Sequence, residues 1–208
     1  FCRNRYRGVC GKDVPLQGSN QLLGSYQEGD IAYADLNGDG YIDGRDKKML
    51  GNSHPRTALG IDVNLQYKNW GLYILGTAEF GLDAFKNNSY YWNKGEEKYS
   101  KVVLDRYHPE NNPNGAYPRL TTTQGDNNFV NSSFWIENAS FFRLKNVELS
   151  YTFTNKKENS LVKKVKLFGR GTNLFVLSKE KDLDPEMMNA GVTNYPVYTT
   201  LTGGAWIF

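Results

Sequence analysis

Two stretches of strictly alternating residues, separated by a two-residue connection, limit the possible fold most strongly. Residues 59–67 place apolar side chains at every second position, with Gly, Asp, Asn and Gln between them. A period of two indicates a β-strand with one apolar face. The alternation resumes at 70–80 after Lys68 and Asn69, so the pair predicts a β-hairpin. The apolar positions are Leu59, Ile61, Val63, Leu65, Tyr67, Trp70, Leu72, Ile74, Gly76, Ala78 and Phe80.

Three further strands are expected later in the chain, which brings the total to five. They cover residues 141–153, 165–177 and about 195–208. The two halves of 141–153 alternate in opposite phase, and the change falls near Lys145. This change indicates either a β-bulge or a strand that leaves its apolar environment.

The composition favours an all-β fold and argues against several functions. The chain has 14 Tyr, 11 Phe and 21 Gly, so helix is expected to be a minor component. A net charge of +3 without a basic run gives no reason to expect a nucleic-acid partner. No apolar run reaches the length of a spanning helix. Catalysis is not expected either, because the carboxylates of Asp105, Glu110, Asp184 and Glu186 read as solvated loop residues without a nucleophile and base.

The expected strands are joined by connections of very different length. Short turns fall at Lys68-Asn69 and near Lys156, whereas long segments precede Leu59 and span 86–140 and 179–195. If the strands alternate up and down, all three long segments lie at one end of the sheet. An antiparallel transmembrane β-barrel has this arrangement, with short periplasmic turns and long extracellular loops.

A soluble β-sandwich is the alternative, since its strands also alternate and its aromatic residues fill a core. The barrel is favoured because Tyr, Trp and Phe gather near the expected strand ends, as interfacial girdles require. In the barrel, polar positions would line a hydrated interior and apolar positions would face lipid. The interior positions would be Asp62, Asn64, Gln66, Glu79, Asn146 and Glu148, and the lipid-facing ones would include Ile61, Val63, Val147 and Leu149.

Residues 35–46 have the ligand spacing of a calcium loop. Oxygen-bearing residues occupy positions one, three, five, seven, nine and twelve around Gly40 at position six, where a sharp turn is needed. Position twelve holds an Asp instead of the usual bidentate Glu, and the flanks do not read as helices. A solvated Asn-Gly-Asp-Gly turn is the alternative. As a calcium site the loop would be a structural clip, with ligands from Asp35, Asn37, Asp39, the Tyr41 carbonyl, Asp43 and Asp46.

Cys2 and Cys10 are the two cysteines of the chain. They bracket a short segment, so a loop-closing disulfide in an oxidising compartment and a free pair of loop thiols are both open. The chain begins with Phe1 and shows no charged-then-apolar leader. We therefore expect it to start within a longer protein.

Several segments, in order along the chain, resemble the C-terminal part of SusC/RagA-like TonB-dependent outer-membrane transporters. The most specific is the Trp-Ile-Glu-Asn-Ala-Ser-Phe-Phe-Arg-Leu-Lys-Asn-Val run at 135–147. The last residues resemble the Gly-x-x-aromatic-x-aromatic assembly signal of barrel precursors. The matching segments are 29–43, 106–111, 117–120, 135–153, 169–175, 183–186 and the final Gly203, Trp206 and Phe208.

The resemblance implies that residues 1–208 are the last strands of a twenty-two-stranded barrel. The plug domain and the N-terminal extension would lie outside this chain. The family works in the Gram-negative outer membrane with a SusD-like surface lipoprotein and draws energy through TonB, which contacts the missing N-terminal part. Its substrates are oligosaccharides or peptides, and the calcium loop would be extracellular. The alternative function is a secreted, soluble, calcium-stabilised binding or adhesion module.

Substrate contacts, if the chain makes any, are expected from the segments 86–140 and 179–195. Aromatic rings suit stacking on sugars or on peptide side chains. The same rings could instead pack the loops on each other or on the lipoprotein. The residues concerned are Tyr90, Tyr91, Trp92, Tyr107 and Trp135.

Overall fold

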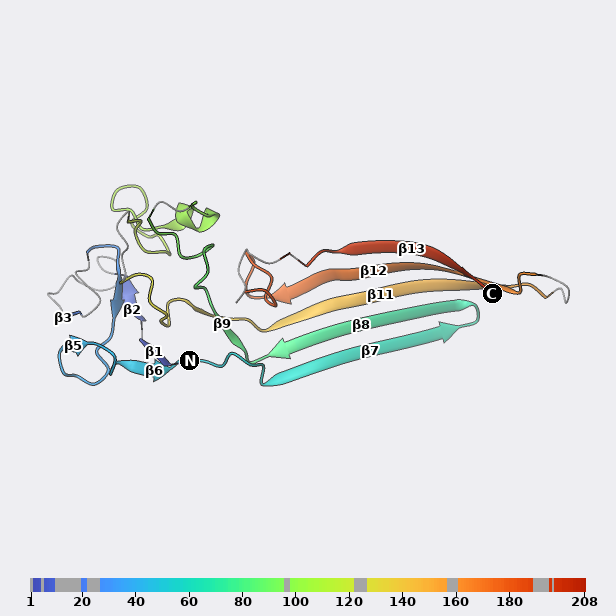
Figure 1. The fold of residues 1–208 in the computed structure, drawn as a ribbon, viewed down its shortest axis with the longest axis horizontal. Helices are drawn as coiled ribbons and strands as arrows, with labels where there is room; N and C mark the ends of the chain where they lie inside the picture. Colours follow the sequence, from blue (N-terminus) through green and yellow to red (C-terminus); the bar gives the residue numbers. More distant parts are fainter. Residues whose placement is uncertain are drawn as a thin grey trace. The chain divides into compact units, whose positions relative to one another are not determined.

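The structure is a computed structural model in which the chain folds as two compact units (Figure 1). One, the sheet unit, comprises His54–Leu82, Asn138–Pro185 and Tyr195–Phe208. The other, the loop unit, comprises Phe1–Ser53, Asp83–Glu137 and Glu186–Asn194. Among the described residues, no helix is long and apolar enough to cross a membrane. The described residues are 2–4, 6–9, 20–21, 27–95, 98–121, 127–156, 161–188, 195 and 197–208.

The sheet unit is a single antiparallel sheet of five long strands (Figure 1). Their spatial order is β13-β12-β11-β8-β7, so strands that follow one another in this unit are neighbours. The five strands predicted from the alternating pattern are confirmed. β7 and β13 are the two edges of this sheet. The strands are β7 (Thr57–Tyr67), β8 (Trp70–Phe80), β11 (Phe141–Thr154), β12 (Lys164–Ser178) and β13 (Thr200–Ile207).

The two short connections lie at the same end of the sheet (Figure 1). Tyr67 pairs with Trp70 across the two-residue turn, and Lys68 adopts the left-handed conformation at φ 53°. The turn is tied to β11, because Asn69 accepts from the Thr152 N–H at 2.9 Å and donates to the Thr152 carbonyl at 2.8 Å. The β8-to-β11 and β12-to-β13 connections leave from the other end of the strands. The predicted asymmetry of the connections is therefore confirmed.

A β-bulge in β11 explains the change of phase in the sequence. Leu144 pairs with Gly76 and Asn146 pairs with Leu75, which leaves Lys145 as an extra residue. An extra residue shifts the alternation by one position. Phe142 and Leu144 therefore share a face with Val147 and Leu149 despite their opposite phase, and the bulge interpretation is confirmed.

The sheet has one apolar and one polar face, and the apolar face is largely exposed. Leu59 and Ile61 are both 51% exposed, and Leu149 is 50% exposed. A β-sandwich would bury such a face against a second sheet. The described part of the sheet unit has no second sheet, so the sandwich alternative is not supported. The register puts these apolar residues on one face: Leu59, Ile61, Val63, Leu65, Leu72, Ile74, Val147, Leu149, Leu167 and Leu201.

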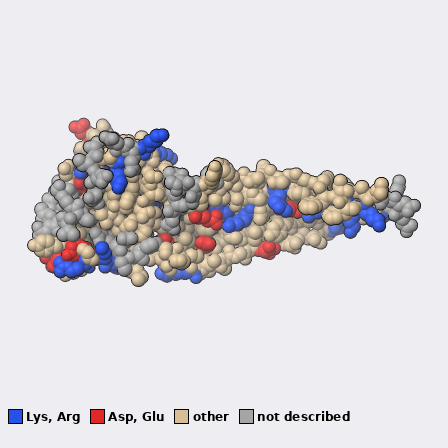
Figure 2. Space-filling view, viewed as in Figure 1, with Lys and Arg blue, Asp and Glu red and all other residues tan. Residues whose placement is uncertain are grey.

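The opposite face carries charged and polar side chains. Glu148 receives hydrogen bonds from Lys166 at 3.1 Å and from the Arg170 Nε at 3.0 Å. The Tyr73 hydroxyl donates to Asp62 at 3.1 Å. Figure 2 shows Lys, Arg, Asp and Glu side chains spread along a face of the sheet. The division into polar and apolar positions that the sequence predicts is therefore present in the fold.

One predicted boundary is wrong. The last strand was expected from about Tyr195, but β13 starts at Thr200. Its ladder with β12 ends at the pair Thr172 and Thr200, next to Asn173, which has a left-handed φ of 50°. Beyond this point Asn173 donates to the Tyr198 carbonyl, and its own carbonyl accepts from the Thr199 hydroxyl. These side-chain bonds take the place of continued strand pairing.

The loop unit contains short two-stranded pairings that the sequence analysis did not predict. The pairs are β1 with β6, β2 with β4, β3 with β5, and β9 with β10; the pair β3–β5 is parallel. Cys10 and the side chain of Cys2 lie outside the described residues, so the disulfide stays a prediction. The elements are β1 (Cys2–Asn4), β2 (Tyr6–Val9), β3 (Asn20–Gln21), β4 (Ile31–Tyr33), β5 (Tyr41–Ile42), β6 (Lys47–Met49), β9 (Asp83–Phe85), β10 (Ile136–Asn138) and the 3-10 helix η1 (Lys101–Asp105).

Candidate functional site

The aspartate-rich loop 35–46 runs from the end of β4 to the start of β6 and contains β5. Gly38 and Gly40 have φ angles of 77° and 80°, in the left-handed region that favours glycine. Open space surrounds the position of a Cβ at both residues. The sharp turn expected at Gly40 is therefore present, and backbone conformation is the reason for glycine there.

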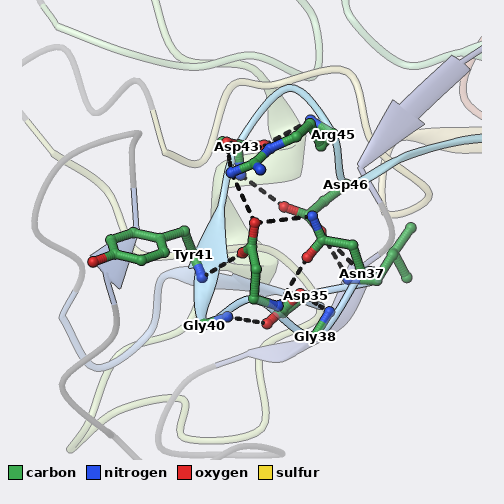
Figure 3. Close-up of polar contacts among 10 residues, drawn as sticks. Asp35, Asn37, Gly38, Gly40, Tyr41, Asp43, Arg45 and Asp46 are labelled. Carbon is green, nitrogen blue, oxygen red and sulfur yellow. Dashed lines mark hydrogen bonds and ion pairs between the residues drawn. The ribbon is translucent and has the colours of Figure 1, made fainter.

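The loop's carboxylates bind its own backbone (Figure 3). Asp35 accepts from the N–H groups of Gly38 at 2.6 Å and Gly40 at 2.8 Å. Asp46 is fully buried and accepts from the N–H groups of Leu36 and Asp43, both at 2.8 Å. Asp46 thus fastens the two ends of the loop together.

Arg45 brings two of the expected metal ligands together (Figure 3). Its Nη2 lies 2.7 Å from an oxygen of Asp39 and 2.9 Å from an oxygen of Asp43. Asn37 lies beside them and donates to Asp39 at 3.0 Å. In this arrangement a guanidinium supplies the positive charge that neighbouring carboxylates require. The ligand spacing of the loop gives no role to Arg45, which stands at position eleven.

The hydrogen bonds favour the ionised form of these carboxyl groups. The Gly40 N–H, with further backbone bonds, lowers the pKa of Asp35 below its usual 3.8. The Arg45 side chain lowers the pKa of Asp43 in the same way, and the two carboxylates beside it raise the pKa of Arg45. The loop therefore holds full negative charges at neutral pH.

The expected ligands are close in sequence but do not converge on one point. In the part of the chain that the structure describes, no three His, Cys, Asp or Glu residues are grouped so as to hold a metal ion. Asp35 and Asp46 face backbone N–H groups, whereas Asp39 and Asp43 face Arg45. The oxygen-rich donor set suits a hard cation such as Ca²⁺, but binding it would require these side chains to exchange their present partners.

A buried polar network, which the sequence analysis did not single out, joins distant parts of the loop unit. Asp30 is 2% exposed and accepts from Asn128 at 2.7 Å and from Arg119 at 3.1 Å. Asn128 also accepts from the Ile31 N–H at 2.8 Å, and the Tyr33 hydroxyl donates to the Asn127 carbonyl at 2.6 Å. Burial is the main reason why the pKa of Tyr33 is raised. The network fastens β4 to residues 119 and 127–128.

The loop aromatic residues pack on one another. Trp135 is 1% exposed, its ring centroid lies 4.7 Å from that of Phe134, and its Nε1 donates to the Asn128 carbonyl at 2.7 Å. Tyr91 and Tyr107 are 2% and 5% exposed. A cavity beside Tyr91 and Trp135 has a volume of only about 20 Å³, room for roughly one water molecule. For these three residues the packing interpretation is confirmed, and they offer no free surface to a substrate.

Comparison with known proteins gives consistent results for sequence and fold. No family model matches the chain. TonB-dependent receptor P26 of Formosa agariphila is 30% identical over 203 residues, which cover 89% of this chain and 20% of that protein. TonB-dependent receptor SusC of Bacteroides thetaiotaomicron is 30% identical over 176 residues, 82% of this chain and 16% of that protein. The chain thus spans a fifth or less of the length of these relatives.

The fold matches part of a solved peptide transporter. A structure of the RagAB peptide transporter aligns with 100% of this chain and 22% of its own, with a TM-score of 0.70 and 19% identity. The RagAB peptide importer in its open-open state aligns equally far, with a TM-score of 0.69 and 18% identity. These structures establish likeness of fold. The five-stranded antiparallel sheet therefore has the architecture of an unclosed sector of such a barrel.

Proposed function

We propose, from the premise that the chain is a SusC/RagA-like fragment, that its sheet unit forms a sector of the wall of an outer-membrane nutrient importer. In this proposal residues 1–208 belong to the C-terminal part of the barrel. The apolar face of the sheet contacts outer-membrane lipid, and the polar face lines the hydrated interior. The loop unit, with the aspartate-rich loop, lies on the extracellular side.

The observation that carries the proposal is the exposed apolar face opposite a face with ion pairs. Exposed residues such as Leu59, Ile61 and Leu149 need an apolar solvent, which lipid provides. Glu148, Lys166 and Arg170 on the other face need water or each other. The aromatic residues Trp70 and Tyr151, with ring centroids 4.8 Å apart near the short-turn end, are placed as an interfacial girdle would be.

The relatives support an inference about the substrate, the energy source and the partner. The matched proteins are named TonB-dependent receptors, and the matched structures contain a peptide importer, RagAB. We infer that the complete protein imports peptides or oligosaccharides, draws energy through TonB by a segment outside this chain, and works with a SusD-like surface lipoprotein. The chain would then have no catalytic role.

Extraction of the native protein from membranes tests this function. A detergent-dependent species much larger than the 23.6 kDa of this chain, co-purifying with a lipoprotein, is expected. Uptake of labelled peptides and of labelled oligosaccharides is then measured in cells with and without TonB. TonB-dependent uptake of either class supports import and identifies the substrate class. A detergent-free soluble species of 23.6 kDa would instead favour a secreted binding module.

We further propose that the loop 35–46 binds a structural Ca²⁺. The ligands would be Asp35, Asn37, Asp39, the Tyr41 carbonyl, Asp43 and Asp46. Support comes from the calcium-loop spacing and from the left-handed turn at Gly40. Asp39 and Asp43 already converge on a cationic group, so a divalent ion could take the place of the Arg45 guanidinium.

Calorimetric titration of the full-length protein in detergent tests the calcium site. A Kd on the order of 10⁻⁴ to 10⁻³ M is expected, as for extracellular calcium modules. Asp39→Asn should weaken binding, whereas Asp105→Asn, on an exposed residue outside the loop, should leave it unchanged. Absence of saturable binding by the unaltered protein at millimolar Ca²⁺ would show that the loop is a solvated turn.

A further inference from the structure

A groove crosses the apolar face of the sheet over β11, β12 and β13. Gly169 and Gly203 pair directly and form its floor, because neither has a side chain on this face. Val147, Leu149 and Leu201 form its walls, and its volume is about 460 Å³. A Cβ added to Gly169 would meet no atom within 4 Å, and one added to Gly203 would meet only the Phe168 carbonyl, at 3.9 Å. Close backbone packing therefore does not require glycine at these two positions.

The groove is suited to a hydrocarbon chain. Its floor is bare backbone, because Gly169 and Gly203 lie opposite each other in the β12–β13 ladder and neither carries a side chain. Arg170 lies between Gly169 and Gly171 in sequence. Its side chain is bonded to Glu148, which belongs to the polar face. Arg170 contributes to the lining of the groove, but its guanidinium is already bonded to Glu148, so the groove suits an apolar ligand better than a polar one. An acyl chain would gain from covering the leucine and valine walls.

A cationic turn lies at one end of this face. The connection between β11 and β12 ends with Lys163, and Lys164 is the first residue of β12; both are exposed, and Leu161 in the connection is 101% exposed. A second hollow, of about 360 Å³, is lined by both lysines and by Phe153, Asn155 and Val162. At the surface of a lipid bilayer, exposed cations can bind the phosphate groups and an adjacent exposed leucine can contact the acyl chains.

The spacing between turn and groove matches one leaflet of a membrane. Lys164, the first residue of β12, lies five positions before Gly169, which is about 17 Å at roughly 3.3 Å per residue. Half of a hydrocarbon core of about 30 Å is about 15 Å. On the apolar face, the intervening positions are Val165 and Leu167, paired with Ile207 and Ala205. An apolar path therefore leads from the cations to the groove.

We propose that this face binds an anionic glycerophospholipid, with its phosphate at Lys163 and one acyl chain in the groove over Gly169 and Gly203. The inference rests on the proposed barrel function. It places the lipid in the leaflet at the short-turn end of the strands. The acyl chain would lie beside the side chains of Tyr151 and Phe153, whose ring centroids are 4.6 Å apart.

Native mass spectrometry of the full-length protein with added phosphatidylglycerol or phosphatidylethanolamine tests the proposal. Phosphatidylglycerol should be retained preferentially. Lys163→Gln should lower its affinity about fivefold, as expected for loss of one basic residue near an anionic headgroup. Lys181→Gln, on an exposed residue in the connection at the opposite end of the strands, is the matched control.

Filling the groove tests the acyl chain separately. Gly169→Val combined with Gly203→Val should reduce retention of phosphatidylglycerol. Gly60→Val is the control, because Gly60 lies in the same sheet, has open space around it and pairs with Thr77 on the polar face. Unchanged retention in the double variant would overturn the groove, and equal retention of both lipids would overturn the anionic headgroup.

Folding is read independently from the heat-dependent shift in gel mobility that folded outer-membrane barrels show. Variants that keep this shift and lose the lipid support the inference. If the unaltered protein shows the shift but retains no phosphatidylglycerol, the lipid inference fails and the barrel function stands. If the unaltered protein needs no detergent and shows no shift, the proposed function itself fails.

Discussion

The guanidinium of Arg119 lies alongside the buried carboxylate of Asp30, with Nε 2.8 Å from Oδ1 and Nη2 3.1 Å from Oδ2. The Arg119 N–H also donates to the Gly29 carbonyl at 2.9 Å. The two residues are 89 positions apart in the sequence. This contact joins two of the segments by which the chain resembles its relatives, 29–43 and 117–120.

Asp30→Asn should loosen the loop unit. The substitution keeps the shape of the side chain but leaves Arg119 without its counter-charge. The cost should be about 2–3 kcal/mol, less than for a fully buried pair because Arg119 is 28% exposed. Faster hydrogen exchange of peptides covering 27–33 and 127–135 should report it. Glu110→Gln, on an exposed loop residue, should not change the exchange, and equal effects of both variants would contradict a special role for the pair.

Gly29→Ala should be more harmful than Gly38→Ala. Both glycines have positive φ, 87° and 77°, so both variants carry a backbone penalty of about 1–2 kcal/mol. A Cβ on Gly29 would in addition overlap the Tyr107 ring, whereas one on Gly38 would meet nothing within 4 Å. Proteolysis of the loops in increasing urea measures the difference. Equal sensitivity of the two variants would mean that the Tyr107 ring moves aside without cost.

Lysine at Val63 should impair barrel assembly more than lysine at the adjacent Asn64. Val63 lies in the middle of β7 and pairs with Ile74 on the apolar face, whereas Asn64 pairs with Tyr73 on the polar face. A lysine facing the middle of a bilayer costs about 2–4 kcal/mol, and one facing water costs much less. The yield of heat-modifiable protein in outer membranes provides the measurement. Equal yields would argue against a lipid-facing sheet.

Arg45→Ala should raise the affinity of the loop for Ca²⁺. The guanidinium forms ion pairs with the carboxylates of Asp39 and Asp43, and these ion pairs must break before the carboxylates can bind a metal ion. Removing this competitor should tighten binding by about threefold to tenfold, equivalent to roughly 0.7–1.4 kcal/mol. Calorimetric titration of the variant beside the unaltered protein tests this. Weaker binding would show that Arg45 supports the liganded loop.

Acid should open the closed arrangement of the same loop. The hydrogen bond from Arg45 lowers the pKa of Asp43 in the folded protein below its usual 3.8. A lowered pKa means that this contact stabilises the loop above pH 3.8, and that the stabilisation is lost as the pH falls through the lowered value. Hydrogen exchange of a peptide covering 35–46, corrected for intrinsic rates, should lose protection in that range. Asp43→Asn should show low protection at all pH values, and an unchanged pH profile in this variant would rule out Asp43 as the titrating group.

The sheet was predictable because its residues follow one periodic rule. The alternation of Leu59, Ile61 and Val63 allows one register of the apolar face, since a slip of one residue would turn every side chain over. The bulge was visible as a change of phase near Lys145, although its alternative could be dismissed only from the pairing of Leu144 and Asn146 with successive residues of β8.

The loop unit was much less predictable. Its strands have two to four residues, too few to show a period. The side chains that bond to Asp30, those of Arg119 and Asn128, lie far away in the sequence, and no local pattern pairs them with it. The spacing of the aspartate-rich loop predicted the turn at Gly40 but could not foresee Arg45, because position eleven of a calcium loop has no assigned ligand role. Contacts between distant segments, and a neighbouring cation that binds the expected metal ligands, become visible only in the three-dimensional structure.

The odd number of strands in the sheet has a consequence for closure. Each neighbouring pair is antiparallel, so β7 and β13, as first and fifth strands, point in the same direction. If these two edges met, their pairing would be parallel. A closed cylinder with antiparallel neighbours throughout has an even number of strands. The five strands therefore cannot close on themselves as an antiparallel barrel. A closed antiparallel barrel that contains this sheet needs an odd number of additional strands.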